Sequence, residues 1–508
     1  MSRFKLFLFN SIILTLTSIL VRVIDMFFSV YVANKIGSEG SGLFELITCV
    51  FMFSVTFANS GINLAATRIV GEEVDTGNIS GIKFAIKKCI LYSLFFGTFA
   101  CALLFIFAKP ISATLLHGKL SCTPIYIMAI SLPFNSVTTS LCGYFSGIRK
   151  VSKTSFTKVL SMFFRVFITC LFLYIVPSYN IEDVYTFLVL ANTISTIFEF
   201  LCTYLLYLFE KRKYKDTNYK AKKYFGKIFE IAFPVAVTSY VRSGLSTLKQ
   251  MLIPMRLEKF NLSCDVSLSQ YGLINGMTLP VLMFPSVFIN SFASLLIPEF
   301  ARYNLKEDYR RMNQVICFIF KITSFFSICI IGIFLTFTEE ICYLIYHNYN
   351  IVQYIAILCP LIVLIYLDNI IDSMLKGLDE QINVMFCNIF DLFLSTTLIY
   401  FLLPIYGIYG YIFIIFVSEI LNFSISLYQL YRKTKFKFDY IFCIVIPFLV
   451  VLVVKCLFDC FDTVASNTIE IIALKVFIFT LIYCALVLFS DLFNRRRKDC
   501  VYPKKIKF

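Results

Sequence analysis

Apolar residues follow one another along this chain in long stretches that short polar connections separate. About 20 consecutive apolar residues form a helix long enough to cross the hydrocarbon core of a bilayer. The pattern therefore predicts an all-α integral membrane protein with about 14 transmembrane helices. We place them at approximately residues 8–33, 42–66, 85–108, 122–147, 156–177, 184–209, 228–250, 270–298, 314–338, 353–376, 384–404, 409–431, 439–459 and 469–491.

Basic residues gather in alternate connections between these stretches. One set of connections is rich in Lys and Arg, and the opposite set holds few basic residues together with acids such as Glu182, Glu339 and Asp459. Since basic connections stay on the cytoplasmic side, both termini are predicted to lie inside. The basic connections are the N-terminus and the segments 149–158, 211–227, 302–311, 432–437 and 495–507.

Composition supports the membrane interpretation. Hydrophobic residues make up 59% of the 508 residues, far above the usage of soluble domains. A net charge of +15 would suggest nucleic acid as the partner of a soluble protein, but here the basic residues border helices and face the anionic inner leaflet. We expect membrane lipids as partners, no nucleic acid and no cleaved signal peptide.

The chain repeats its organisation. The stretches at 122–209 and 353–431 each show a proline, a charged turn, a helix with a charge at mid-depth and a short outer turn. This predicts two parallel six-helix lobes, a plan in which transporters bind substrate between the lobes. The predicted divisions are an N-lobe at 1–210, a basic cytoplasmic linker at 211–227, a C-lobe at 228–436, and two further helices with a basic tail at 437–508.

Charged residues inside the predicted spans are candidates for the substrate site, because each is costly in hydrocarbon unless it lines water or finds a partner. Arg22 and Asp25 share a helical face at i, i+3 spacing. They form either an ion pair that neutralises both charges, or a site in the cavity that binds the anionic head group of a substrate and rearranges on protonation. Arg242 has no acid three or four residues away, so its counter-charge must come from another helix or from a substrate.

Other polar residues in the spans have two interpretations each. Asn59 and Asn275 either face the cavity or bond neighbouring helices. A second group of ionisable residues either locks helices together in pairs or takes part in ion coupling. This group is Arg165, Glu199, Asp368, Asp372, Asp391 and Glu419.

Signals of catalysis and metal binding are missing from the sequence. The two histidines, His117 and His347, both fall in predicted outer connections. There is no phosphate-binding GxxxxGK[ST] loop, and the cysteines are mostly scattered singly in apolar stretches without a CxxC pair. We therefore expect no enzyme, no catalytic residues, no metal site and no cofactor.

One resemblance is specific. Three parts of the chain resemble the stage V sporulation protein B family, a branch of the polysaccharide exporters, and the likeness extends through the whole chain. They are the opening helices with Leu14–Ser18, Arg22, Asn34–Gly37 and Asn59–Ile62, the outer segment Ile253–Leu257, and the stretch Ser269–Pro285 with its continuation to Arg302.

The resemblance implies a fold shared with lipid II flippases and multidrug extruders. It also implies a flippase in the bacterial cytoplasmic membrane that moves an undecaprenyl-pyrophosphate-linked saccharide outward, for peptidoglycan of the spore cortex or for surface polysaccharide. Arg22 and Arg242 would hold the pyrophosphate. Phe28 and Ser29 occupy the places of an Arg-Asp pair of the lipid II flippase branch, and Asp25 replaces the family's usual Gly.

Two other functions stay open. One is a cation-coupled multidrug antiporter, since an acid such as Asp25 is the kind of group that binds Na⁺ or H⁺ in that branch. The other is a non-transporting scaffold that recruits wall-synthesis enzymes. Transport would be driven by H⁺, Na⁺ or the membrane potential, and the expected partners are a lipid-linked saccharide and wall-synthesis enzymes.

Overall fold

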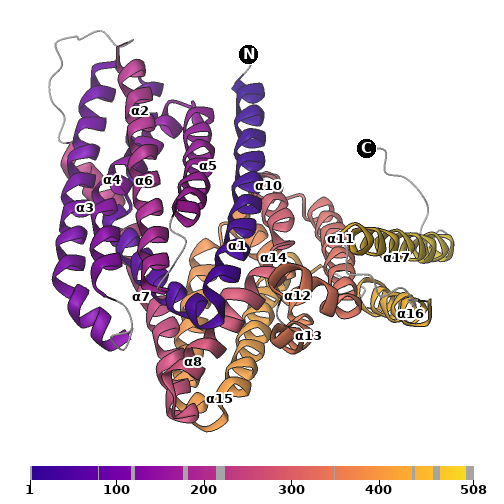
Figure 1. Cartoon of the computed structure of the whole chain (residues 1–508). Helices are drawn as coiled ribbons and strands as arrows, with labels where there is room; N and C mark the ends of the chain where they lie inside the picture. Colours follow the sequence, from indigo (N-terminus) through magenta and orange to yellow (C-terminus); the bar gives the residue numbers. More distant parts are fainter. Residues whose placement is uncertain are drawn as a thin grey trace. The chain divides into compact units, whose positions relative to one another are not determined.

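The structure is a computed structural model that describes residues 3–77, 79–115, 121–175, 181–212, 224–347, 349–436, 441–461 and 469–498. Every regular element in these ranges is a helix (Figure 1). The helices form two compact units. Unit 1 comprises Met1–Gly276 and Leu392–Tyr411, and unit 2 comprises Met277–Asp391 and Ile412–Phe508.

Unit 1 contains the first half of the chain. Its core joins α2, α3, α4, α6 and α7, with small residues such as Ala65 and Ala85 beside the rings of Tyr92, Tyr144 and Phe145. The elements are α1 (Arg3–Asn59), α2 (Ile62–Asp75), α3 (Ile79–Leu115), α4 (Thr123–Gly147), α5 (Val151–Ile175), α6 (Ile181–Lys211), α7 (Tyr224–Asn261), α8 (Cys264–Tyr271) and the π-helix η1 (Gly272–Thr278), whose last residues continue into unit 2.

Unit 2 has its own core. Phe337, Phe479 and Tyr483 pack against Val451 and Val454 where α11, α16 and α17 meet. The elements are α9 (Leu279–Met283), α10 (Ser286–Lys306), α11 (Tyr309–Thr336), α12 (Thr338–Tyr346), η2 (Tyr349–Ile351), α13 (Val352–Leu358), α14 (Leu361–Gly377), α15 (Gln381–Thr434), η3 (Ile441–Val445), α16 (Ile446–Phe461) and α17 (Ile469–Lys498).

Two glycines break long helical elements. Gly37 in α1 has φ +70° and Gly407 in α15 has φ +56°, a backbone conformation that side chains with a Cβ rarely adopt. Each element is therefore two helices joined at a sharp bend. The bend at Gly37 lets residues before and after it face each other.

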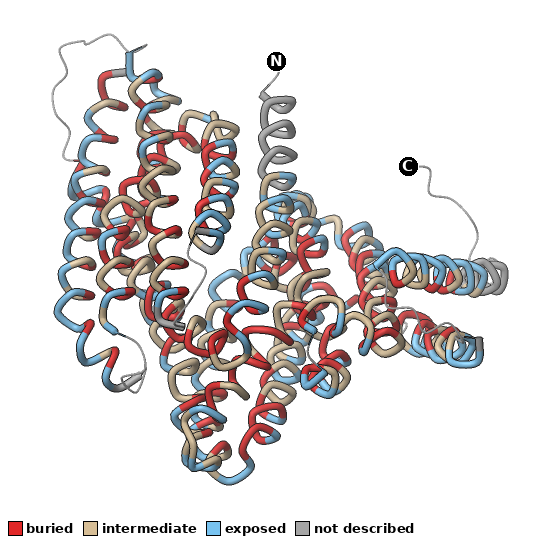
Figure 2. The backbone as a smooth tube through the Cα atoms, in the orientation of Figure 1, coloured by how far each residue is buried: buried red, intermediate tan, exposed pale blue. Residues whose placement is uncertain are grey.

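Large apolar side chains cover the outer faces of the helices. On α3, Phe95, Phe99, Ile106 and Phe107 are all exposed, and Figure 2 shows exposed positions along much of this helix. Exposed apolar rows of this length suit lipid, in which the helix satisfies its own backbone hydrogen bonds. The chain is a multi-pass membrane protein.

The number of crossings stays a prediction. Nine described helices are long and apolar enough to span a membrane, or up to eleven if each of two bent pairs is one span. The predicted lobe boundaries also stay a prediction. Residues 224–276 pack in unit 1, whereas residues 213–223, 437–440, 462–468 and 499–508 of the predicted linker, added helices and tail lie outside the described residues.

Candidate functional site

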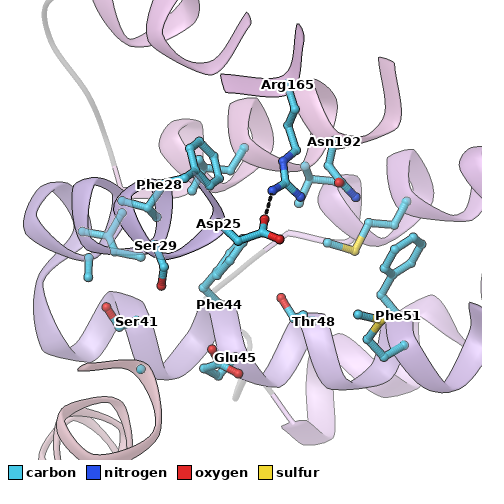
Figure 3. A pocket seen from close by; sticks show the side chains of 18 residues that line it. Asp25, Phe28, Ser29, Ser41, Phe44, Glu45, Thr48, Phe51, Arg165 and Asn192 are labelled. Atoms are coloured by element: carbon cyan, nitrogen blue, oxygen red, sulfur yellow. Dashed lines mark hydrogen bonds and ion pairs between the residues drawn. The ribbon is translucent and has the colours of Figure 1, made fainter. Parts of the chain in front are cut away.

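A cavity of about 320 Å³ lies within unit 1, enclosed by α1, α4, α5, α6 and η1 (Figure 3). Most of its wall is apolar, with residues such as Val32, Phe44 and Met128. A smaller set of polar side chains shares the same space. These are Asp25, Ser29, Ser41, Glu45, Thr48, Arg165 and Asn192.

Both halves of α1 contribute to this wall because the helix bends at Gly37. Asp25 and Ser29 come from the first half and are four residues apart, which places them on one face. Ser41, Glu45 and Thr48 come from the second half at spacings of four and three, and they follow one side of that helix in Figure 3. The bend brings the two polar faces to one cavity.

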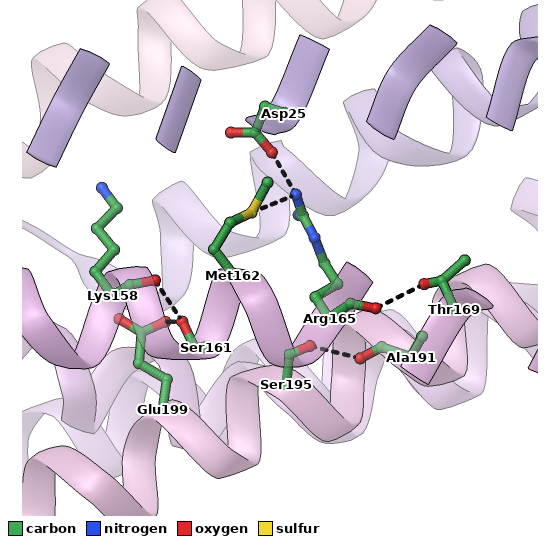
Figure 4. A network of polar contacts seen from close by, with 9 residues as sticks. All are labelled: Asp25, Lys158, Ser161, Met162, Arg165, Thr169, Ala191, Ser195 and Glu199. Atoms are coloured by element: carbon green, nitrogen blue, oxygen red, sulfur yellow. Dashed lines mark hydrogen bonds and ion pairs between the residues drawn. The ribbon is translucent and has the colours of Figure 1, made fainter. Parts of the chain in front are cut away.

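An ion pair connects α1 to α5 in the cavity. Arg165 Nη2 donates to Asp25 Oδ1, and the two side chains are 24% and 48% exposed (Figures 3 and 4). The Arg165 guanidinium also lies 5.1 Å from the centre of the Phe28 ring, within the range of a cation–π contact. Asp25 thus pairs with Arg165 rather than with Arg22.

Arg165 has donor capacity left over. Its Nη2 also lies 3.0 Å from Met162 Sδ, while its buried Nε has no hydrogen-bond partner among the described residues. A guanidinium carries five N–H donors and no acceptor. The cavity therefore holds a cation that is anchored by one carboxylate and can still bind an anion.

The α5–α6 contact orients this part of the wall. Ser161 on α5 donates to Glu199 Oε2 on α6 at 3.1 Å, and Thr169 donates to the Arg165 carbonyl oxygen at 2.9 Å (Figure 4). Glu199, predicted to lock helices or couple ions, thus contacts a neighbouring helix through a hydroxyl. Its role in coupling stays a prediction.

The other predicted binding residues lie outside the cavity lining. Arg22 on α1 and Arg242 on α7 are exposed, and neither forms an ion pair within the described part of the chain. Asn59 ends α1, and its buried Oδ1 has no partner among the described atoms. Asn275 in η1 accepts a hydrogen bond from Tyr411 at 3.0 Å. Their binding role stays a prediction.

The remaining predicted acids lie in unit 2. Asp368 on α14 accepts a hydrogen bond from Asn422 on α15 at 2.9 Å, and Ser418 donates to Asp391 across the bend of α15. Asp372 lies 3.8 Å from Lys376 on the same helix. Glu419 lies in the same half of α15 as Ser418 and Asn422. Asp368, Asp372 and Asp391 thus contact polar or charged side chains within unit 2, and their role in coupling stays a prediction.

Glu45 and Asn192 were missed by sequence reasoning. Glu45 is the fourth residue of the predicted span 42–66, so the cost of an acid in hydrocarbon was only a limited signal for it. Asn192 offered only a weak signal, because amides inside spans often bond neighbouring helices. The cavity thus contains one acid more than the sequence analysis assigned to it.

Known proteins resemble this chain over most of its length. Stage V sporulation protein B of Bacillus subtilis (strain 168) is 21% identical over 423 residues, which are 80% of this chain and 79% of that protein. Sporulation protein YkvU of the same strain is 18% identical over 358 residues, 69% of this chain and 77% of that protein. The resemblance drawn from the sequence is confirmed.

Solved structures establish the fold. The lipid II flippase MurJ in its inward closed conformation matches with a TM-score of 0.70 at 14% identity, covering 96% of this chain and 99% of that chain. A multidrug resistance MATE family transporter in its inward-facing conformation matches with a TM-score of 0.65 at 13% identity, covering 82% and 96%. Both matches cover most of this chain and show its fold.

A family model supplies the classification. It carries the description "Polysaccharide biosynthesis protein" and matches residues 7–304, which is more than half of the 508 residues. The matched region includes the whole lining of the cavity in unit 1. The chain therefore belongs to the polysaccharide biosynthesis protein family.

Proposed function

We propose that this chain is a flippase that moves an undecaprenyl-pyrophosphate-linked saccharide outward across the bacterial cytoplasmic membrane by alternating access. The likeness to stage V sporulation protein B and the fold shared with the lipid II flippase MurJ support this proposal. Peptidoglycan precursor for the spore cortex and a polysaccharide repeat unit are the two candidate cargoes. The polar cavity of unit 1 is the site where we expect the head group to bind.

Arg165 is the observation that carries the proposal. Among the described lining residues it is the one basic side chain, and its Nε is buried and free to donate. Guanidinium groups bind phosphate oxygens through paired N–H donors, and such charge-assisted bonds are stronger than neutral ones. We expect the pyrophosphate to take the place of Asp25 on Arg165 when the substrate enters.

The charge balance of the cavity implies coupling to a cation. Asp25 and Glu45 provide two carboxylates against one guanidinium. A pyrophosphate would add further negative charge beside these carboxylates, which is unfavourable unless one of them is neutralised. Uptake of H⁺ or Na⁺ at Asp25 or Glu45 would offset this charge, so these two residues are our candidates for coupling.

A cation-coupled multidrug antiporter is the second candidate function. The same excess of carboxylates favours it, because the lining would attract an organic cation and Arg22 and Arg242 lie outside the lining. The two functions differ in the role of Arg165. An anionic head group requires the positive charge of Arg165, whereas a cationic drug would bind better without that charge.

Outward movement of fluorescent lipid II in proteoliposomes tests the proposal. We compare the parent with Arg165→Ala and with Arg212→Ala, a control at the exposed end of α6 outside the cavity. Loss of Arg165 should slow flipping by at least about tenfold, because a hydrogen bond to a charged group contributes about 1.5–3 kcal/mol and 1.4 kcal/mol is a factor of ten. The control should flip like the parent.

Arg22→Ala and Arg242→Ala belong in the same assay. If they abolish flipping while Arg165→Ala leaves it intact, the head group binds elsewhere and the assignment of the cavity is wrong. Export of a fluorescent organic cation by a parent that does not flip lipid II would favour the antiporter. A parent that transports neither compound would favour a scaffold or another polyprenyl-linked glycan.

A further inference from the structure

Tyr271, the last residue of α8, is 0% exposed, and its hydroxyl group has no hydrogen-bond partner among the described atoms. A buried hydroxyl group that is left unsatisfied costs free energy, so its presence in a folded protein requires an explanation. The O–H group can donate one hydrogen bond, and the partner that would satisfy it is a nearby acceptor. The function proposed above makes no use of this group.

Glu45 on α1 is a second unpaired group in this part of unit 1. It lines the polar cavity, and its carboxyl group forms no hydrogen bond or ion pair with a described residue, whereas Asp25 is paired with Arg165 (Figure 3). An ionised carboxylate only accepts hydrogen bonds, and it is costly in a half-buried position without a donor. Glu45 therefore lacks a donor, while Tyr271 lacks an acceptor.

Tight packing brings the two groups to one contact between α1 and the end of α8. Gly272 follows Tyr271 in the chain, and a Cβ on Gly272 would lie only 2.7 Å from the Gly42 backbone nitrogen. Gly42 and Glu45 are three residues apart on α1, so they share the face of α1 that meets α8 and η1. Tyr271 interacts electrostatically with Glu45, as expected of neighbours in this contact.

Tyr271 is also joined to the π-helix η1, which begins at the next residue. Asn275 Nδ2 in η1 donates to the Tyr271 carbonyl oxygen at 3.4 Å, and the Tyr411 hydroxyl group donates to Asn275 Oδ1 at 3.0 Å. Single-turn π-helical segments are rare and frequently occur at functional sites. A new hydrogen bond to the Tyr271 side chain would therefore act on η1, whose Gly276 lines the cavity.

We propose that Tyr271 is a positioning residue that binds Glu45 in one state of the transport cycle. When Glu45 is ionised, its carboxylate turns from the cavity and accepts the hydrogen of the Tyr271 hydroxyl group. When Glu45 takes up H⁺ from water as the anionic head group arrives, the neutral carboxyl group stays in the cavity and Tyr271 is unpaired, as it is here. This inference rests on the proposed function, because it needs an anionic substrate in the cavity.

The described titratable or charged groups that face Glu45 or interact with its charge come from α1, α5, α8 and α15. They are Asp25, Cys49, Arg165, Tyr271 and Tyr411. The lining residues of α4, α6 and η1 carry no titratable group. Arg165 is the competing charged donor, but Asp25 already engages it, and the Tyr411 hydroxyl group already donates to Asn275. Tyr271 thus keeps an uncommitted O–H donor for Glu45.

Tyr271→Phe tests the proposal in the lipid II flipping assay, because it removes the hydroxyl group and keeps the ring. Flipping should fall by at least about tenfold, which corresponds to about 1.4 kcal/mol. The lost hydroxyl group is unsatisfied in this structure, so the variant should unfold in detergent at or above the temperature of the parent.

Tyr185→Phe is the matched control. Tyr185 on α6 is also 0% exposed, its hydroxyl group has no partner among the described atoms, and it lies outside the cavity lining. This variant should flip lipid II like the parent. An equal loss of flipping in both variants would show that any buried tyrosine hydroxyl group is needed, and it would overturn the specific role of Tyr271.

Glu45→Gln shows whether Tyr271 acts through Glu45, because glutamine cannot be ionised. Adding Tyr271→Phe to Glu45→Gln should then slow flipping by no more than about twofold, since two residues that act through one contact are not additive. A second tenfold loss in the double variant would mean that Tyr271 acts independently of Glu45, which contradicts the proposal.

Hydrogen exchange of the η1 peptide 272–278 gives a measurement that does not depend on flipping. After correction for intrinsic exchange rates, protection of this peptide should change by at least about tenfold between pH 5 and pH 8 in the parent. The change should be absent from Tyr271→Phe and from Glu45→Gln, and present in Tyr185→Phe. Equal protection of the parent at both pH values would overturn the proposal.

The two measurements separate this inference from the proposed function. Parent-like flipping by Tyr271→Phe would overturn the inference and leave the proposed function standing. A parent that flips no lipid II, but whose η1 responds to pH through Tyr271 and Glu45, would contradict the proposed function for this cargo and support the contact between the two residues.

Discussion

Arg165 and Asp25 form an ion pair, and both lie within predicted membrane spans, where either charge alone would be costly. Insertion of one such side chain at the centre of a helix costs roughly 2.5–3.5 kcal/mol, and an ion pair offsets part of that cost. Both side chains remain partly exposed to the cavity, so the pair is not fully desolvated. A ligand anion can therefore replace Asp25 without leaving a buried charge unpaired, provided that a proton or cation reaches the carboxylate.

Glu380 lies in the turn before α15 and accepts hydrogen bonds from Lys433 and Asn383. The hydrogen bond from Lys433 is the main cause that lowers the pKa of Glu380. Burial raises this pKa, but the positive charge of Lys433 and the hydrogen bond from Asn383 lower it further. Because the folded pKa is lower than the unfolded pKa of about 4.3, the pair stabilises the protein at neutral pH. This stabilisation is lost as the pH falls from the unfolded pKa through the folded one.

We expect Glu380→Gln to melt at a lower temperature than the parent at pH 7, and we expect the difference between the two melting temperatures to become smaller as the pH is lowered to 3. Thermal unfolding of the purified protein in detergent measures both values. Glu307→Gln is the control, since Glu307 is exposed between α10 and α11 and is itself a carboxylate in a turn. A difference between parent and Glu380→Gln that stays constant across this pH range would contradict the assignment.

The sequence indicates which residues are costly in the membrane, but not what they contact. It singled out Arg22, Asp25 and Arg165, because a charged residue inside an apolar span can be recognised from the sequence alone. Helical spacing favoured Arg22 as the partner of Asp25, whereas the structure pairs Asp25 with Arg165 on a helix 140 positions away. That partner depends on how α1 and α5 pack, and local spacing carries no information about it.

At the scale of helices, small residues decide where α1 approaches α8 and η1. Gly42 lies against the Leu268 carbonyl oxygen and Gly272 against the Ser38 carbonyl oxygen, so closely that a Cβ on either glycine would overlap its neighbour. Ser38 and Ser269 exchange a hydrogen bond of 2.7 Å in the same contact. Close packing of small residues and hydroxyl bonds are the main forces that join helices in lipid.

Gly272→Ala should therefore destabilise the protein by about 1–3 kcal/mol, the usual cost of overpacking a tight contact. Thermal unfolding in detergent gives the comparison. Gly226→Ala is the matched control, because a Cβ at Gly226 meets nothing within 4 Å. We expect this control to unfold at or above the temperature of the parent, since alanine favours a helix. Equal stability of the two variants would show that α1 does not need this close approach.

Apolar runs predicted where the helices lie, and the eighth predicted span coincides with α8, η1, α9 and α10. The predicted connections 34–41 and 405–408 contain the breaks at Gly37 and Gly407. The apolar runs did not predict the π-helix η1, because hydrophobicity carries no information about backbone conformation. Small residues at Ser38, Gly42, Ser269 and Gly272 were a usable signal for the α1 contact. The cavity depends on how the two halves of α1 pack on either side of Gly37, and periodicity does not predict that packing.

At the scale of the whole molecule, the asymmetry of basic connections predicts which turns face the cytoplasm. The structure places an exposed residue with a positive φ in several of these turns, which makes them suitable for labelling. Glu307 and Lys435 lie in connections predicted to be inside. Leu262 and His347 lie in connections predicted to be outside.

Single cysteines in a cysteine-free background test this topology with a membrane-impermeant maleimide. Leu262→Cys and His347→Cys should react in intact cells, whereas Glu307→Cys and Lys435→Cys should react only after the membrane is opened. A cysteine-free protein without a new cysteine controls for background. Reaction of Glu307→Cys or Lys435→Cys in intact cells would contradict the predicted orientation. In a protein with the opposite orientation, the side that we expect to receive the substrate from the cytoplasm would face the outside of the cell.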